Sequence, residues 1–339
     1  MRKDILRKLS RFEHLSKSEM QEALTDIVKG KSTEGQVGAF IMGMAMKGAT
    51  VEEISAAAEK FKEWATKVEY PEPDRLVDTC GTGGDKVDTF NVSTMTAFVV
   101  AAAGGKVAKH GNRAVSSKCG SADFLEALGA KIEISPEGAL KLLEEVNIAF
   151  LFAPIYHPAM KNVAKVRREI GVRSIFNLVG PLSNPANAKR QLVGVYDEKL
   201  VPVLADVLNE LGLLRAFVVH GLEGLDEVSI TSETLVGEVN RGTVKVYKIS
   251  PEVLGLKRHR LEDIEGGDCK RNVEIFFEIL KGQNKPAEDF LVINSAFALT
   301  AAGIVENPKE GVKVAQDVIK SGKVARTVER FVELSHKYC

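Results

Sequence analysis

Residues 76–111 read LVDTCGTGGDKVDTFNVSTMTAFVVAAAGGKVAKHG, and this stretch decides the expected fold. The β-branched run LVD leads into a glycine-rich turn, an apolar helical run follows from Ser93, and KVAK reads as the next strand. The alternation continues with a helix from Ala122, a strand KIEI, a helix from Pro136 and a strand IAFLFA. Short strands alternating with helices are typical of a parallel sheet with crossover helices. The pattern predicts an α/β fold.

The residues before this stretch read as helices only. Capping boxes of the form Ser/Thr-x-x-Glu/Gln begin at Ser16, Thr33 and Thr50. Residues 33–48 are rich in glycine and methionine, which indicates close helix packing, and we interpret the methionines as core because Met fills irregular gaps. The prolines of YPEPD at 70–74 end helical continuation and indicate a domain boundary.

Beyond residue 158 the alternation is interrupted and then resumes. Residues 159–185 read as a helix, a polar turn and the stretch NLVGPLSNP, which we interpret as a hinge. QLVGVY, a helix near Leu200, RAFVVHG and LVGEVNRGTVKVYKI follow, with helices to the C-terminus. We expect a small N-terminal helical domain plus a larger domain with a mostly parallel central sheet flanked by helices. The expected domains are 1–70, completed by roughly 159–185, and 74–158 with 186–339.

Composition excludes several classes of protein. The chain has 339 residues, 46 basic and 46 acidic side chains and no net charge, so affinity for nucleic acid through a basic surplus is not expected. No apolar run is long enough to span a bilayer, and no signal peptide is seen. The cysteines lie far apart and form no C-x-x-C pair, so we expect reduced thiols in a cytoplasmic protein. They are Cys80, Cys119, Cys269 and Cys339.

Two loops that follow strands have the residue types of phosphate-binding sites. GTGGD at 81–85 and the helix start at 89–94 offer backbone amides and hydroxyls to an anion, although the glycines fit neither a Walker A motif nor G-x-G-x-x-G. KHGNRAVSS at 109–117 adds cations and hydroxyls after the next strand. In a parallel sheet both loops face one crevice, so the sequence favours a ligand with two phosphate groups. The alternatives are a capped glycine turn and a solvated basic loop.

A third segment, GLEGLDE at 221–227, follows the strand RAFVVHG. Its adjacent carboxylates, Asp226 and Glu227, suit Mg²⁺, which takes one or two protein carboxylates and completes its shell with phosphate and water. The alternative is an acidic surface turn. His110 alone is uninformative, because a single histidine is more often structural.

Together, GTGGD, NVSTMTA, KHGNR, SADFLEALG, HPAM, VRREIG, IFNLVGPLSNP and GLDE resemble, in this order, the anthranilate phosphoribosyltransferase family. The resemblance covers nearly the whole chain. It implies Mg²⁺-dependent transfer of phosphoribose from phosphoribosyl pyrophosphate (PRPP) to the amine of anthranilate, the second step of tryptophan synthesis from chorismate. It also implies two Mg²⁺ ions per subunit and a homodimer formed through the helical domain.

The resemblance also implies roles for individual residues. It assigns to PRPP binding Gly81, Gly84, Asp85, Thr89, Asn91, Val92, Ser93, Thr94, Lys109, His110, Gly111, Asn112, Arg113, Ala114, Val115, Ser116, Ser117 and Ser121. It assigns to anthranilate Gly81, Asn112 and Arg167, and to the lining of its access path His110, His157 and Pro181. It assigns to the metal Ser93, Asp226 and Glu227.

No indispensable general base is expected, because the aromatic amine is already neutral and needs only orientation. Without the resemblance, Arg167 and Arg168 read as a solvated helix face. Two alternatives stay open: a pyrimidine-nucleoside phosphorylase, and a non-catalytic nucleic-acid-binding relative. The first expects a longer chain with a different glycine loop. The second expects a positive charge surplus.

Overall fold

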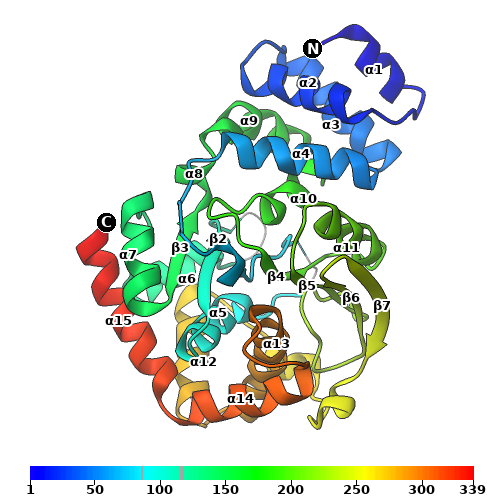
Figure 1. The fold of residues 1–339 in the computed structure, drawn as a ribbon. Helices are drawn as coiled ribbons and strands as arrows, with labels where there is room; N and C mark the ends of the chain where they lie inside the picture. The colour runs from blue at the N-terminus through cyan, green and yellow to red at the C-terminus, as the bar shows by residue number, and fades with distance from the viewer. Residues whose placement is uncertain (85–86, 115–117) are drawn as a thin grey trace.

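The computed structural model describes residues 1–84, 87–114 and 118–339 (Figure 1). Within these residues the strands form a seven-stranded sheet in the order β3-β2-β1-β4-β5-β6-β7. The strands are β1 Leu76–Asp78, β2 Lys106–Gly111, β3 Ile148–Phe152, β4 Arg190–Gly194, β5 Arg215–Gly221, β6 Thr234–Asn240 and β7 Thr243–Ile249. The pairs from β3 across to β5 are parallel, and β5, β6 and β7 pair antiparallel. The predicted mostly parallel sheet is confirmed.

Helices cover both faces of this sheet. The larger-domain helices are α5 Val92–Ala102, α6 Ser121–Ala127, α7 Pro136–Val146, α8 Ala153–Tyr156, α11 Leu200–Glu210, α12 Cys269–Leu280, α13 Lys285–Ala302, α14 Pro308–Lys320 and α15 Lys323–Tyr338. Short 3-10 turns are η1 Pro73–Arg75, η2 Pro158–Met160, η3 Pro251–Leu254 and η4 Leu261–Ile264. One apolar cluster joins α5, α7 and α13 to one face of the sheet, and another joins α11 to the opposite face.

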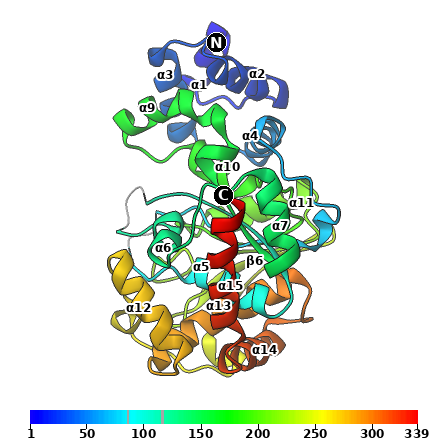
Figure 2. The same ribbon diagram turned by 90° about the vertical axis from the view of Figure 1, so that its left-hand side faces the viewer.

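The remaining helices gather at one end of the molecule. They are α1 Lys3–Leu9, α2 Lys17–Val28, α3 Glu34–Lys47, α4 Val51–Trp64, α9 Lys161–Ile170 and α10 Ile175–Leu182. Helix α9 packs on α2 and α3, and α10 packs on α3 and α4, as both ribbon views show (Figures 1 and 2). The side chains of Ser16, Thr33 and Thr50 accept the amides three residues on, so the predicted capping boxes are confirmed. The division into domains at the stated residues stays a prediction.

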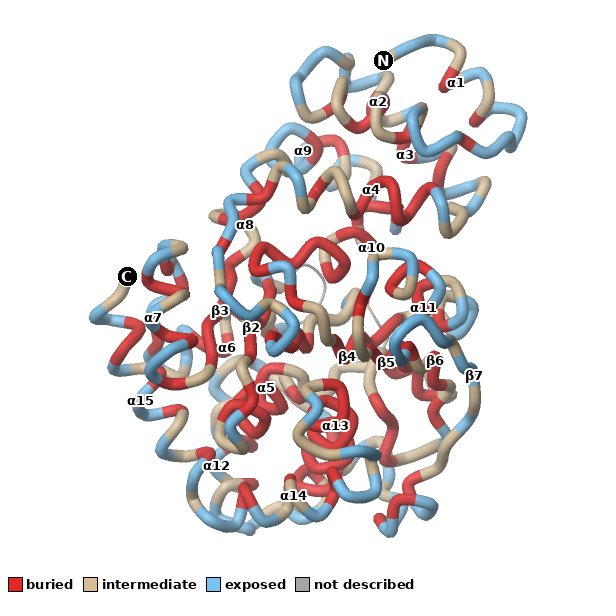
Figure 3. The backbone as a smooth tube through the Cα atoms, viewed as in Figure 1, coloured by how far each residue is buried: buried red, intermediate tan, exposed pale blue. Residues whose placement is uncertain are grey.

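Burial is concentrated around the middle of the sheet (Figure 3). Helix α13 is buried along nearly its whole length, from Ala287 to Ala301. The edge strand β7 is mostly exposed, with Val246 at its surface. The central strands β1, β2, β4 and β5 therefore sit in a rigid core, and the loops at their carboxyl ends are carried on fixed supports.

Two local expectations are wrong. The run KIEI at 131–134 is not a strand, because its polar backbone groups bond to side chains instead of a neighbouring strand: Lys131 N–H donates to Ser335 Oγ at 2.9 Å, and Tyr156 Oη donates to the Ile134 carbonyl at 2.9 Å. The first part of NLVGPLSNP is helical, because α10 continues to Leu182 with Pro181 in its last turn. Proline has no N–H and removes the hydrogen bond to the carbonyl four residues before it, but the helix ends one residue later, so no further turn is disrupted.

No helix in the described part of the chain is both long enough and apolar enough to cross a membrane.

Candidate active site

The carboxyl ends of β1, β4 and β5 pack against one another at the centre of the sheet. The Thr82 N–H, in the glycine loop after β1, donates to the Gly194 carbonyl at 2.9 Å. Gly194 ends β4, and a side chain there would collide with the backbone carbonyl of Asp226 in the turn after β5. The glycine loop and the acidic turn therefore share one edge of the sheet, beside the point where the strand order reverses between β1 and β4.

Asp78, at the end of β1, and Lys109, in β2, connect the ends of these two strands by hydrogen bonds. The Asp78 carboxylate accepts from Cys80 N–H at 3.0 Å, His110 N–H at 3.1 Å and Asn184 Nδ2 at 2.7 Å. Burial raises the pKa of Asp78 to about 6, while Lys109 and these hydrogen bonds oppose the rise. Lys109 is 3% exposed. Two buried ions of opposite sign, each hydrogen-bonded to the neighbouring chain segments, fix the two loops relative to each other.

The Lys109 ammonium contacts the first residues of the glycine loop. Its Nζ donates to the Thr79 carbonyl at 3.1 Å and to Thr79 Oγ1 at 3.2 Å. Thr79 Oγ1 in turn donates to the Ser93 carbonyl in the first turn of α5, at 3.0 Å. These contacts connect Lys109, a cation predicted to bind PRPP, to the start of α5, which is predicted to bind the same ligand.

The N-terminus of α5 carries polar atoms without partners. Asn91 occupies the N-cap position but makes no side-chain cap bond; its Nδ2 donates to the Cys119 carbonyl at 2.8 Å, and its N–H donates to Asn272 Oδ1 at 3.0 Å. Within the described residues, Asn91 Oδ1 and Thr94 Oγ1 are buried with no hydrogen-bond partner. Buried polar atoms normally have partners, so unpaired ones beside a helix N-terminus suit a bound ligand.

The loop after β2 is held by side chains of α6. Ser121 Oγ accepts from Asn112 N–H at 3.2 Å and donates to the Asn112 carbonyl at 3.1 Å. Arg113, predicted for PRPP, is exposed and pairs with Asp123 at 2.9 Å and with Glu126 at 2.9 Å. In this structure the Arg113 guanidinium therefore links the loop after β2 to α6.

The other predicted residues of these loops divide into three groups. Thr89 forms an isolated bridge with Glu265, Gly111 ends β2, and Val92 is a buried residue that begins α5. Ala114 N–H donates to the same Asp123 carboxylate that Arg113 pairs with. The predicted residues Asp85, Val115, Ser116 and Ser117 lie outside the described residues.

One expectation about the cysteines is wrong. Cys119, just before α6, forms a disulfide with Cys269 at the start of α12, across 150 residues of sequence. Cys80 and Cys339 are free thiols. Spacing could not reveal the pair, because folding alone brings the two chain segments together. The bond fixes α12 beside the loop predicted to bind PRPP.

Asp226 and Glu227 are both half-buried in the turn after β5. Their carboxylates and the Ser93 hydroxyl are hard oxygen donors, so the donor set fits Mg²⁺, whose remaining positions phosphate and water would fill. Asp226 lies close enough to raise the pKa of the Cys80 thiol in the glycine loop, although burial is the larger cause. Among the described residues, no group of three or more His, Cys, Asp and Glu side chains comes together as a metal site.

The three residues predicted to line the access path lie together. His110 Nδ1 lies 3.1 Å from the Gly180 carbonyl, and the rings of His110 and His157 are 4.9 Å apart. Gln191 Nε2 donates to the Pro181 carbonyl at 2.8 Å. Burial lowers the pKa of His110 to about 3 and that of His157 to about 4, so both imidazoles are neutral near pH 7. Each Nε2 is buried without a partner among the described residues.

Arg167 and Arg168 differ in environment, although they are neighbours on α9. Arg168 is exposed, whereas Arg167 is half-buried with its guanidinium 5.6 Å from the centre of the Phe176 ring. Burial lowers the pKa of Arg167. A solvated helix face therefore describes Arg168 only, and Arg167 presents a cation that aromatic stacking holds in place.

Several residues that organise the site were missed by the sequence analysis. Asn184 also donates to the Ala108 carbonyl at 2.8 Å and thus links α10 to both central strands, and Asn272 of α12 bonds the start of α5. An asparagine in a proline-rich stretch signals a turn as readily as a buried link, so no local pattern identifies this role. Arg173, which reaches the glycine loop, was also missed.

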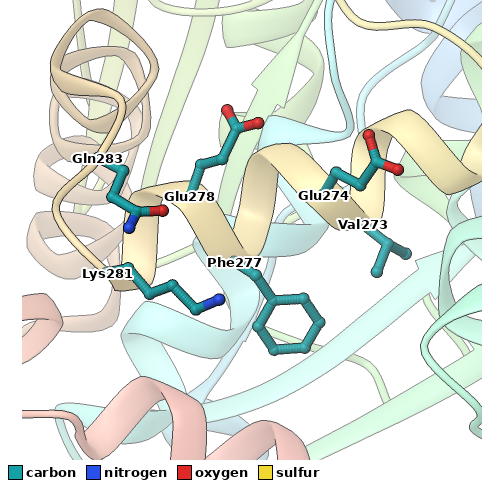
Figure 4. Close-up of a pocket in the computed structure, with 6 residues that line it drawn as sticks. All are labelled: Val273, Glu274, Phe277, Glu278, Lys281 and Gln283. Carbon is teal, nitrogen blue, oxygen red and sulfur yellow. The ribbon is translucent and has the colours of Figure 1, made fainter.

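A hollow on the surface of α12 lies away from the strand ends of the candidate site. It has a volume of about 340 Å³ and runs along the outer side of α12, where Phe277 is exposed beside charged side chains (Figure 4). Its lining residues are Val273, Glu274, Phe277, Glu278, Lys281 and Gln283. None of them belongs to the strand ends described above.

Comparison with known proteins agrees with this geometry. Residues 73–325 match the "Glycosyl transferase family, a/b domain", and residues 3–65 match the "Glycosyl transferase family, helical bundle domain". Anthranilate phosphoribosyltransferase of Persephonella marina is 54% identical, over 99% of this chain and 99% of the relative. The chain belongs to the anthranilate phosphoribosyltransferase family. The resemblance inferred from the motifs is confirmed.

Solved structures of the family share the whole fold. The crystal structure of the Thermus thermophilus anthranilate phosphoribosyltransferase has a TM-score of 0.92 and 39% identity, covering 98% of this chain and 99% of that one. The Saccharomyces cerevisiae enzyme in complex with PRPP and Mg has a TM-score of 0.89 and 29% identity, covering 98% of this chain and 97% of that one. The helical part and the α/β part are thus both features of the family.

Proposed function

We propose that the chain transfers phosphoribose from PRPP to the amine of anthranilate, with release of pyrophosphate, as a Mg²⁺-dependent phosphoribosyltransferase of tryptophan biosynthesis. The proposal rests on one observation: loops that offer amides, hydroxyls and carboxylates lie together at one edge of the sheet. The glycine loop, the open start of α5, the Asn112 loop and the Asp226–Glu227 turn follow β1, β2 and β5. A diphosphate with its metal needs amides, hydroxyls and carboxylates together.

We assign PRPP to the two loops and the start of α5. Asn91 and Thr94 offer buried atoms without partners, and Asn112 and Ser121 are exposed or half-buried on the neighbouring loop. Ser93, with the two carboxylates of the acidic turn, would hold two Mg²⁺ ions. When bound, the metal supplies positive charge to the diphosphate as it leaves.

We assign anthranilate to the side facing α9 and α10. Arg167 would bind its carboxylate through two parallel N–H donors, and Gly81 and Asn112 would border its ring. His110 and His157 remain neutral near pH 7 because burial lowers the pKa of each, so they orient the substrate by hydrogen bonds without adding charge.

Catalysis on this site is electrostatic. As the C–O bond to pyrophosphate breaks, negative charge grows on the leaving group and positive charge on the ribose carbon. Amides and the helix dipole aimed at the phosphates therefore stabilise the transition state more than the ground state. The aromatic amine attacks as a neutral nucleophile, so positioning is the main requirement.

Neither alternative function is favoured. Matches over the full length to anthranilate phosphoribosyltransferases leave no support for a nucleoside phosphorylase. Basic side chains cluster in residues 2–11 and 257–260, and ion pairs that occupy several of them oppose a nucleic-acid-binding surface. These pairs are Arg2 with Glu22, Lys8 with Glu19, Arg258 with Glu252, and Arg260 with Asp263.

The proposal includes a homodimer formed through the helical domain and a cytoplasmic location. The location is supported by the similarity to biosynthetic enzymes and not by reduced thiols, because Cys119 and Cys269 form a disulfide. The interpretation of the methionines of residues 33–48 as core is wrong for Met42 and Met46, which are exposed on α3, whereas Met44 is buried. The two exposed side chains support an apolar contact with a second copy of the chain. Sedimentation velocity would test the dimer: a monomer at micromolar concentration would reject it.

The test of function is the loss of anthranilate fluorescence on mixing the protein with PRPP. Loss that requires Mg²⁺, stops in excess chelator and does not occur with other aromatic acids would establish both donor and acceptor. A folded protein that binds PRPP but leaves anthranilate unchanged would mean that the acceptor is wrong. A protein that binds no PRPP would reject the reaction class.

A further inference from the structure

Arg173 brings a cation from the helical part of the molecule onto the glycine loop. It lies between α9 and α10, and it is exposed. A β-carbon built on Gly84 would lie 3.1 Å from Arg173 Nη2 and 3.3 Å from Nε. Gly84 has a φ of +86°, so the position rejects a side chain for its backbone conformation as well. The loop is thus shaped to let the guanidinium approach its backbone.

A second contact fixes where the guanidinium lies. Arg173 Cζ sits 4.1 Å from the centre of the Tyr196 ring. Tyr196 follows β4 by two residues, and Gly194 at the end of β4 accepts the N–H of Thr82 in the same glycine loop. The aromatic ring that supports the cation and the loop that the cation touches are therefore carried by adjacent strands.

This placement leaves N–H donors of the Arg173 guanidinium available to a ligand. Stacking on an aromatic ring uses a face of the planar group, whereas its five N–H donors point outward in the plane. Phosphate oxygens match that planar fork, and the pairing is stronger than with a neutral donor. An exposed, stacked arginine that lies beside the loop assigned to PRPP is positioned to bind a phosphate.

We propose that Arg173 is a further donor-binding residue, which contacts the pyrophosphate group of PRPP over Gly84. The inference rests on the proposed function and adds a cation to the groups named there. It also gives the helical part a direct contact with the donor, since Arg173 and Arg167 both come from the segment that spans α9 and the start of α10. One segment then serves donor and acceptor through two arginines.

The experiment compares Arg173→Ala with the wild type by steady-state kinetics and by competitive inhibition with inorganic pyrophosphate. The KM for PRPP and the inhibition constant of pyrophosphate should each rise at least about tenfold, as expected for loss of a charge-assisted hydrogen bond. The KM for anthranilate should stay within about twofold. Arg173→Lys, which keeps the charge but not the fork, should recover part of the loss.

Two further variants separate binding from structure. Arg168→Ala removes a nearby exposed arginine and should leave both constants at wild-type values. Tyr196→Leu removes the stacking face and should raise the KM for PRPP less than Arg173→Ala does. The double variant should resemble Arg173→Ala alone, because the two residues act on one contact.

The outcomes are distinct. If the wild type does not consume anthranilate with PRPP, the proposed function fails. If the wild type is active and Arg173→Ala keeps the wild-type PRPP and pyrophosphate constants, the inference about Arg173 is wrong. It is also wrong if Arg173→Ala weakens both substrates equally, or if Arg168→Ala has the same effect.

Discussion

Replacing His157 with glutamine should change how the stability of the fold depends on pH. Burial lowers the pKa of His157 to about 4 and that of its neighbour His110 to about 3. In an unfolded chain both imidazoles have a pKa of about 6.5. As the pH falls below that value the unfolded state takes up protons first, so the folded state loses stability. The loss continues until the folded pKa of each imidazole is reached.

The magnitude follows from these pKa values. Between pH 7 and pH 5 each histidine removes about 2 kcal/mol from the free energy of unfolding. Asp78 acts in the opposite direction, because its pKa is raised to about 6 and its folded form takes up a proton first. Over the same interval Asp78 adds about 1 kcal/mol to the free energy of unfolding. These three groups together should therefore lower the stability by about 3 kcal/mol, and without His157 by about 1 kcal/mol.

Urea denaturation at pH 7, 6 and 5 measures this difference directly. The glutamine variant should lose about 2 kcal/mol less than the wild type between pH 7 and pH 5, whatever its stability at pH 7. His14→Gln is the matched control, because His14 is exposed on the helical part, and its pH dependence should follow the wild type. Equal pH dependence of the His157→Gln variant and the wild type would refute the reasoning.

Three other predictions concern the site and its support. Asp226→Asn should move the Mg²⁺ dependence of activity to higher concentration, since one carboxylate ligand is lost; an unchanged titration contradicts the metal assignment. Arg167→Ala should raise the KM for anthranilate by about tenfold or more and leave the PRPP KM nearly unchanged, and an equal rise in both would reject its role. Cys269→Ser should lower the stability by about 4–5 kcal/mol under oxidising conditions, because the disulfide closes a loop across 150 residues. Thermal unfolding with and without reductant, with Cys339→Ser as control, checks this; identical melting of both variants would rule it out.

Features that depend on a few neighbouring residues could be predicted from the sequence. The capping boxes at Ser16, Thr33 and Thr50 are confirmed because both partners lie within one helical turn. The strands around IAFLFA and RAFVVHG are confirmed because continuous apolar runs suit buried parallel strands. The order of the motifs then identified the family.

Features that depend on distant segments could not be predicted in this way. KIEI has the pattern of a strand, yet Ser335 and Tyr156 supply its hydrogen bonds from remote parts of the chain. Cys119 and Cys269 meet only because α6 packs against α12. The sequence around Arg173 does not indicate that the folded chain brings its guanidinium beside Gly84. In each case the deciding contact joins residues that no local spacing relates.

The buried histidines also bear on the absence of a general base from the proposed mechanism. A base with a pKa of about 3 or 4, as His110 and His157 have, holds a proton too weakly to remove one at neutral pH. Asp78 is a buried carboxylate of this region, but it already accepts hydrogen bonds from Cys80, His110 and Asn184. A neutral amine needs no such base before it attacks, and it gives up its proton once the new bond makes it cationic. The low pKa of the two imidazoles therefore does not slow the reaction, and it keeps positive charge off the access path of an anionic substrate.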